Sequence, residues 1–128
     1  MPIQYTIHPD ANWIDVTGSE TIEEQDLRSV FQTYISDPVF RPGMHVLVDL
    51  QNAELRADTA IVRNFVDMLE VNQSRRGKDY CIALLVQRGF QETLSHLFSI
   101  YVQNRPVKCE VFTERDAALE WLVASNPP

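Results

Sequence analysis

Two dense apolar runs, at residues 44–50 and 80–87, constrain this fold more than any other feature of the sequence. They read Met-His-Val-Leu-Val-Asp-Leu and Tyr-Cys-Ile-Ala-Leu-Leu-Val-Gln, with little alternation of apolar and polar side chains. Such runs are typical of β-strands that are covered on both faces, as in a parallel sheet between helices. Residues 107–112 form a third, shorter run. The sequence therefore predicts a sheet covered by helices.

The remaining segments predict a hairpin and four helices. Two short segments of period two, 3–8 and 12–18, flank Pro9-Asp10-Ala11, whose residue types favour a turn. Apolar side chains then recur at helical spacing in four stretches. The predicted helices are residues 21–36, beginning at a capping box from Thr21 to Glu24, residues 57–74, residues 90–101, and a closing helix after a local cap at 113–116.

The resulting order of elements is ββαβαβαβα. Strands that alternate with helices of about ten or more residues imply right-handed crossovers, so the three later strands are predicted to be parallel. A chain of 128 residues is long enough for one compact domain, and no linker or repeat divides it. We expect a single α/β domain over residues 1–128, with a mostly parallel sheet flanked by helices.

The charge of the chain restricts its partners. Eleven Lys and Arg against eighteen Asp and Glu give a net charge of −7. Nucleic-acid binding rests on a positive field over the phosphates, so this class of partner is not expected. No stretch approaches the length of apolar residues that inserts into a membrane, and the first residues lack the pattern of a signal peptide. A cytoplasmic protein is the expectation.

The cysteines and the first strand give two further expectations. Cys81 and Cys109 lie within apolar runs and form no CxxC pair, which predicts buried, reduced and unreactive thiols. Residues 3–7 carry no charge, and the hairpin is expected to leave them at an edge of the sheet. Since uncharged edges invite pairing, self-association as a homodimer is predicted.

No motif points to catalysis, a cofactor or a metal. A single glycine near Arg76 does not make a phosphate loop, and His8, His45 and His96 lack metal-ligand spacing. The cluster of Arg75, Arg76 and Lys78 at a helix end predicts a solvated cap. A carboxylate dyad stays open as an alternative, drawn from Asp15, Asp49, Asp58 and Asp79.

The carboxyl ends of the strands are the expected site of function. In open parallel sheets, ligands and partners meet these ends and the helix amino termini beside them. The polar residues expected to collect there are Asp49, Gln51, Asn52, Asp58, Thr59, Gln87 and Thr113.

Residues around this site resemble a known family. The segment 45–50, followed nine positions after Asp49 by Asp58-Thr59-Ala60-Ile61, resembles the strand and phosphorylation loop of STAS domains, the anti-sigma-factor antagonist (SpoIIAA-like) family. Segments 37–43 and 111–122 are similar to its uncharacterised bacterial branch. The resemblance covers nearly the whole chain and implies the order of elements given above.

The resemblance implies a non-catalytic protein-interaction or regulatory domain. In the switching members, a partner kinase phosphorylates the Ser of an Asp-Ser-x-Gly motif to control docking. Thr59 would occupy the Ser position, whereas Ile61 stands where the family has Gly. The implied interaction and phosphorylation loop comprises Asp49, Gln51, Asn52, Asp58 and Thr59, and the implied partner is a protein such as a kinase or another signalling protein. Read without the resemblance, Asp58 simply caps the helix.

A second function stays open. Related folds are similar to lipid-carrying Sec14-like domains, and Phe90, Phe98 and Tyr101 could line a pocket for a small apolar ligand or lipid. An internal cavity of roughly several hundred Å³ would favour ligand binding. A filled core with an exposed patch near the strand ends would favour protein interaction. Neither function is enzymatic.

Overall fold

The computed structural model describes residues 2–56 and 60–125. The five strands form one sheet in the order β1-β2-β3-β4-β5. The strands are β1 (Ile3–His8), β2 (Trp13–Glu23), β3 (His45–Arg56), β4 (Tyr80–Leu85) and β5 (Val107–Phe112). The helices are α1 (Glu24–Ile35), α2 (Ala60–Val71), α3 (Gln73–Arg76), α4 (Phe90–Tyr101) and α5 (Arg115–Ala124). The predicted α/β class is confirmed.

The sheet is mixed, with β1 antiparallel to β2 and the other neighbours parallel. A short turn suffices to reverse the chain between β1 and β2, whereas a parallel neighbour needs a crossover. Each later pair of strands is joined through at least one helix, as the alternation of runs and helical stretches predicts. The predicted antiparallel pair at the amino terminus and the three later parallel strands are both confirmed.

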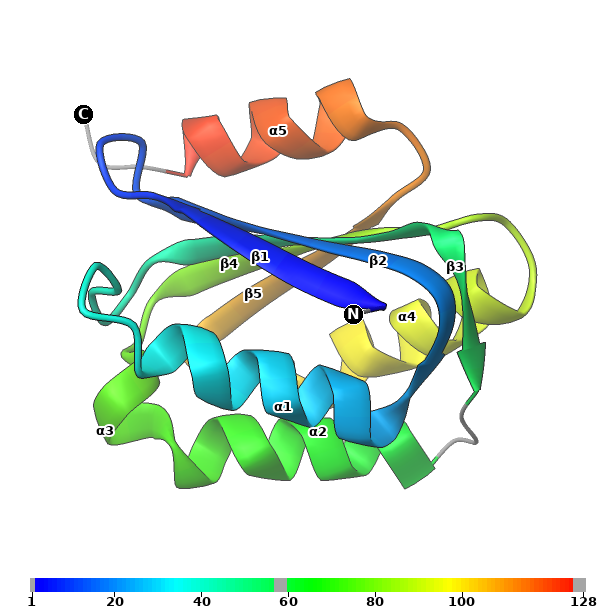
Figure 1. The fold of residues 1–128 in the computed structure, drawn as a ribbon, viewed down its shortest axis with the longest axis horizontal. Helices are drawn as coiled ribbons and strands as arrows, with labels where there is room; N and C mark the ends of the chain where they lie inside the picture. The colour runs from blue at the N-terminus through cyan, green and yellow to red at the C-terminus, as the bar shows by residue number, and fades with distance from the viewer. Residues whose placement is uncertain (1, 57–59, 126–128) are drawn as a thin grey trace.

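Helices cover the two faces of the sheet unequally (Figure 1). Helix α5 lies on one face, and α1, α2 and α4 lie on the other. Because side chains alternate along a strand, Leu47 of β3 packs under α5 with Ala118 and Leu122, while Val46 belongs to the opposite core. We call these the α5 face and the three-helix face.

Strands β2 and β3 run further than the sequence predicts. Residues 19–23 continue β2 and pair with 52–56 of β3, so the predicted helix start at Thr21 is wrong. Ile22 is fully buried in this strand. Hydrogen bonds to β3 pair the backbone groups of this segment, which a capping box was expected to pair. Helix α1 begins instead at Glu24, where the Asp26 Oδ2 accepts a bond of 2.9 Å from the Glu23 amide.

The predicted helix over 57–74 is also different in the structure. Helix α2 ends at Val71, and the short α3 follows. Between them, the Asn72 Nδ2 donates to the Met68 carbonyl at 2.8 Å, a side-chain bond that competes with the helical ladder. After α3, Gly77 has a φ of +96°, and a Cβ there would lie 2.3 Å from the Gly43 amide nitrogen. Only glycine fits this close approach.

Arg76 contradicts the predicted solvated cap. It is fully buried, and its guanidinium carbon lies 3.6 Å from the centre of the Tyr80 ring, with Tyr34 and Phe40 nearby. Within the described part of the chain, no hydrogen-bond partner reaches its guanidinium nitrogens. The aromatic pocket formed by α1, β4 and the segment before β3 therefore holds this cation through ring contacts.

The two cysteines are free, as predicted, but they differ in burial. Cys81 is buried, and its backbone amide donates to the His45 Nδ1 at 2.9 Å. Cys109 is only half-buried, since β5 is an edge strand, although burial still raises the pKa of its thiol to about 12. The prediction that both are buried is therefore correct for Cys81 and too strong for Cys109.

Candidate functional site

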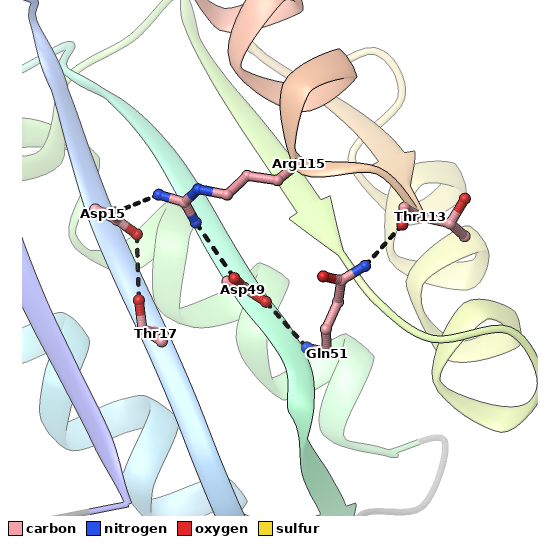
Figure 2. Close-up of polar contacts among 6 residues, drawn as sticks. All are labelled: Asp15, Thr17, Asp49, Gln51, Thr113 and Arg115. Carbon is pink, nitrogen blue, oxygen red and sulfur yellow. Dashed lines mark hydrogen bonds and ion pairs between the residues drawn. The ribbon is translucent and has the colours of Figure 1, made fainter.

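A polar cluster on the α5 face joins β2, β3 and α5 (Figure 2). Arg115, the first residue of α5, donates from Nη2 to the Asp15 Oδ2 at 2.7 Å and from Nη1 to the Asp49 Oδ2 at 3.3 Å. The parallel register places Thr17 beside Asp49, so Asp15 and Asp49 share one face two residues apart. The side chains of Asp15 and Asp49 are only 18% and 12% exposed. The fold thus builds a bridged pair from two of the acids that the sequence offered for a dyad.

The position of Arg115 at the start of α5 explains its ion pairs with Asp15 and Asp49. A cation in the first turn of a helix is opposed by the positive end of the helix dipole. The two carboxylates offset this cost and fix the start of α5 over β2 and β3. Arg115 therefore engages one oxygen of each carboxylate. Among the residues that the structure describes, no cluster of His, Cys, Asp and Glu side chains could hold a metal ion.

Gln51 extends the cluster to the ends of the next two strands. Its backbone N–H donates to the Asp49 Oδ1 at 3.0 Å, and its side-chain Nε2 donates to the Thr113 carbonyl at 2.7 Å (Figure 2). Gln87, just after β4, donates from Nε2 to the Gln51 carbonyl. The structure therefore brings together Asp49, Gln51, Gln87 and Thr113, as the parallel topology led us to expect. We call Asn52, Gln87 and Thr113, which are exposed around this network, the strand-end surface.

The remaining predicted site residues are placed differently. Asn52 is exposed and lies beside Ser19 within the extended β3, so residues 51–56 are strand and not the predicted loop. Asp58 and Thr59 lie outside the described residues. Arg115 is the residue that the sequence analysis missed. Its position at a helix start, against the dipole preference, is the signal that could have pointed to an acidic partner.

A separate apolar cavity of about 120 Å³ lies between the sheet and α1, α2 and α4. Protein cores usually leave few voids larger than a water molecule, whereas the described side chains leave this larger space on the three-helix face. The described lining residues are Val16, Leu27, Val30, Phe31, Tyr34, Val46, Val48, Leu50, Leu55, Ile61, Val62, Phe65, Leu69, Ile82, Leu84, Ser95 and Phe98. Almost all are apolar, which suits an uncharged ligand.

Polar contacts join the helices at the two ends of this cavity. At one end, the Asn64 Nδ2 of α2 donates to the Glu24 Oε1 of α1 at 3.1 Å. At the other, Arg75 of α3 donates to the Ser36 Oγ at 2.9 Å. Between these contacts the two helices present only apolar side chains and the Tyr34 ring to the cavity. Separating α1 from α2 would therefore require the loss of exposed or half-exposed hydrogen bonds, which are weak in water.

The aromatic residues predicted to line a pocket do so only in part. Phe98 lines the cavity and meets Phe65 of α2 with ring centres 6.5 Å apart. Tyr101 is 45% exposed and lies outside the lining. The side chain of Phe90 lies outside the described residues. The cavity is formed chiefly by aliphatic residues of β2, β3, β4, α1 and α2.

A second hollow, of about 180 Å³, lies where α2 and α3 meet the end of α4 and β5. Its floor includes Tyr80 and Val107, and its rim carries Glu70, Gln73 and Arg105. Arg105 is engaged in an ion pair with Glu70 and donates to the Tyr101 carbonyl. The charged groups of this rim therefore bind each other, and the apolar cavity is the better candidate site for an apolar molecule.

Comparisons with known proteins support the fold. No family model matches the chain, and no curated protein does. Among solved structures, the chain is similar to an uncharacterised protein of the DUF3478 family with a SpoIIAA-like fold from Shewanella loihica PV-4. The TM-score is 0.60 at 13% identity, over 94% of this chain and 91% of that chain. The chain thus has a SpoIIAA-like fold, as the sequence resemblance implied. Within the described residues, no helix is long and apolar enough to span a membrane.

Proposed function

We propose that this chain is a non-catalytic regulatory domain that contacts a protein partner through its strand-end surface. The observation that supports the proposal is the network through Gln51, which fixes the ends of three strands by side-chain bonds. A surface that is ordered before binding loses little conformational entropy when a partner arrives. The SpoIIAA-like fold is compatible with this function, and the engagement of both carboxylates by Arg115 favours binding over acid–base chemistry.

A substitution on this surface tests the proposal. Asn52→Lys adds a charged side chain at an exposed position, and Gln103→Lys makes a comparable change at an exposed position in the turn after α4. Affinity purification from the native cells, followed by mass spectrometry, should recover a protein partner with the wild type and Gln103→Lys but not with Asn52→Lys. Recovery of the same partner with all three proteins would contradict the strand-end surface.

The resemblance suggests that a kinase acts on Thr59 in the bacterial cytoplasm. Under this proposal, Thr59→Ala abolishes phosphate incorporation in a cell extract and keeps any constitutive partner. Thr59→Glu should weaken binding of the partner, because the added negative charge repels acidic groups that are attracted to a helix amino terminus. Unmodified Thr59, together with the same partners for all three proteins, would contradict regulation by phosphorylation. The contact through the strand-end surface is tested separately by Asn52→Lys.

The apolar cavity favours a second candidate function, the binding of a small apolar ligand. Its volume of about 120 Å³ is below the several hundred Å³ of an ordinary ligand pocket. It is nevertheless close to the engineered cavities of about 150 Å³ that bind benzene. The cavity is thus of the right order of size for a single small ring, whereas a lipid chain would require α1 and α2 to separate.

Thermal denaturation with benzene and indole tests this second function. A ligand that binds only the folded state raises Tm as its concentration increases, by mass action. The control is Val48→Phe, which places a ring where Val48 lines the cavity and should remove the rise. No rise in Tm for the wild type, or an equal rise for Val48→Phe, would contradict a ligand site in this cavity.

A further inference from the structure

Within residues 2–56 and 60–125, no strand pairs the backbone groups on the outer edge of β1. Strand β1 is the first in the sheet order and pairs with β2. The Ser19 amide donates to the Pro2 carbonyl at 2.7 Å, which fixes the phase of this antiparallel ladder. Since backbone groups alternate in direction along a strand, Gln4 and Thr6 direct theirs toward β2. Ile3, Tyr5 and Ile7 therefore direct their amides and carbonyls outward.

This edge lacks the charges that usually protect an edge strand. The opposite edge, β5, exposes Lys108 and Glu110, which is a common protection against pairing. Residues 3–7 carry no charge on a chain whose net charge is −7. Helix α1, which packs on β1, exposes the uncharged side chains of Gln25, Ser29, Gln32 and Thr33, together with the ion pair of Arg28 and Glu24. Asp37, an acid that contacts β1, is already bound, since the Tyr5 hydroxyl donates to its Oδ2 at 2.8 Å. The residues of β1 that would meet a second copy therefore bring no charge of their own to the pairing.

We propose that β1 pairs antiparallel with β1 of a second copy of the chain, about a two-fold axis at Tyr5. This register sets Ile3 opposite Ile7 of the second copy, and each outward amide and carbonyl then has a partner. Gln4 faces Thr6 of the second copy on the α5 face, where an amide and a hydroxyl can bond across the axis. The two sheets become one continuous sheet of ten strands.

The ends of β1 fit the same register. Pro2 lies opposite His8 of the second copy, and a proline within a ladder usually removes a donor. Here the Pro2 backbone faces β2, so its missing N–H is not required at the dimer interface. On the three-helix face, Ile3, Tyr5 and Ile7 already pack against the core and would form a row with the same residues of the second copy. The edge is self-complementary along its whole length.

Two double variants of the full chain test the register. Gln4→Lys with Thr6→Lys sets like charges opposite each other twice across the axis, and like charges directly opposite destabilise a strand pair. Gln4→Glu with Thr6→Lys sets opposite charges at the same places. Both residues are exposed on β1, and both variants share the change at Thr6, which lies opposite Asp15. Circular dichroism and Tm first establish that both variants fold.

Net charge cannot explain the expected difference between the variants. Two added lysines change −7 to −5, whereas the Glu–Lys variant keeps −7, so the like-charge variant has the weaker overall repulsion. Sedimentation equilibrium at tens of micromolar should show a dimer for the wild type and the Glu–Lys variant. The dissociation constant of the Lys–Lys variant should rise by about tenfold or more. In the dimer, hydrogen exchange should protect the amides of Ile3, Tyr5 and Ile7.

Three results would overturn the proposal. They are a monomeric wild type, a Lys–Lys variant that dimerises as well as the wild type, and equal loss of the dimer in both variants. None of them bears on the strand-end surface or the cavity, which lie elsewhere in the fold. The dimer therefore stands or fails independently of the proposed function.

Discussion

The two faces of the sheet differ in how completely side chains fill the space beneath the helices. On the α5 face, a single helix covers Leu47, Ala83 and Leu85, which are fully buried, and the hollow beside α5 is only about 10 Å³. On the three-helix face, three helices leave a cavity of about 120 Å³. The number of covering helices therefore does not decide how well a face is filled.

Side-chain size and polar contacts explain the difference. Ala83 of β4 and Ala118 of α5 are both fully buried, and such small residues let the helix approach the sheet closely. Arg115 adds a bridge that holds the start of the helix in place. On the other face, the described side chains leave the cavity open, and its larger apolar residues do not close it. Hydrogen bonds there join α2 to α1 through Asn64 and Glu24, and α3 to Ser36, just after α1, through Arg75. The α5 face is thus a scaffold, and the three-helix face has room for a ligand.

The largest expected change in stability comes from truncating a leucine of β3, and it should differ between two leucines on opposite faces of that strand. Leu47→Ala on the α5 face should lower the free energy of unfolding by about 4 kcal/mol, because it opens a new cavity in a filled core. Leu50→Ala should cost only about 2 kcal/mol, since Leu50 already lines a void and has fewer contacts to lose. Urea denaturation of both variants measures the difference. Equal losses would mean that the two faces are packed alike.

The next comparison adds similar volume to each face. Ala83→Val should cost about 2 kcal/mol, because the fully buried site beneath α5 has no space for two more carbon atoms. Val48→Phe should instead stabilise the protein by about 1 kcal/mol by filling the cavity. The midpoints of urea denaturation, at unchanged m-values, report both effects. A destabilising Val48→Phe would show that the cavity walls cannot accept the ring.

Two arginines on opposite faces should respond with opposite signs. Arg115→Met should lower the free energy of unfolding by about 1 kcal/mol, less in high salt, because the bridge to Asp15 and Asp49 is partly exposed. Arg76→Met should raise the free energy of unfolding by about 1 kcal/mol. It replaces a fully buried cation, whose guanidinium has no hydrogen-bond partner among the described residues, by an apolar chain of similar length.

The control for Arg76 is Arg76→Ala, which removes the stem as well and should destabilise the protein through lost packing. Denaturation in low and high salt distinguishes the two arginines. Destabilisation by Arg76→Met would instead indicate that the contact with the Tyr80 ring outweighs the burial of the charge.

The smallest effect at neutral pH concerns the thiol of Cys109, on the three-helix face. Burial raises the pKa of this thiol from 9.0 to about 12. The protonated, buried thiol contributes its full share to the free energy of unfolding below pH 9. This contribution is lost as the pH rises from 9 toward 12, because the thiol of the unfolded chain releases its proton at lower pH than the thiol of the folded protein. Stability of the wild type should therefore fall above pH 9, and Cys109→Ala should reduce this fall.

Cys81→Ala provides the control, because it leaves Cys109 in place and should keep the decline. Burial also raises the pKa of Tyr80 above its ordinary 10.0, so some loss at higher pH persists in every variant. Identical alkaline profiles for the wild type and Cys109→Ala would contradict a buried thiol in β5.

Much of the fold follows from local patterns in the sequence. The bounds of β1 and β5 coincide with the predicted 3–8 and 107–112, because each of these strands is bounded by turn residues and pairs over its full length. The extension of β3 through Arg56 has no such signal, since 51–56 is polar and is strand only because β2 pairs with it. At Asn72, where the helix is interrupted, both the backbone N–H and the side-chain Nδ2 donate to the Met68 carbonyl.

The sequence predicted where the candidate site lies in the fold but not all of the residues that form it. Parallel topology alone indicates that Asp49, Gln51, Gln87 and Thr113 meet, because the strands that carry them end at the same side of the sheet. The Asp15–Arg115 contact joins residues 100 positions apart, and nothing local distinguishes this arginine's partner from other acids. Arg76 shows the same limit, since a basic cluster at a helix end indicates solvent exposure until an aromatic pocket is placed around it.

The sequence by itself determined the order of the strands and of the four longer helices, the single antiparallel pair and the division of these helices into a buried and an exposed face. Periodicity records which side of an element is buried, and this information is local. Only the tertiary structure decided the cavity, the bridged carboxylates and the burial of Arg76. Each depends on distances between elements far apart in the chain, and the cavity alone is lined by side chains from six of them. Those distances are set by how differently sized side chains pack together, which no single segment encodes.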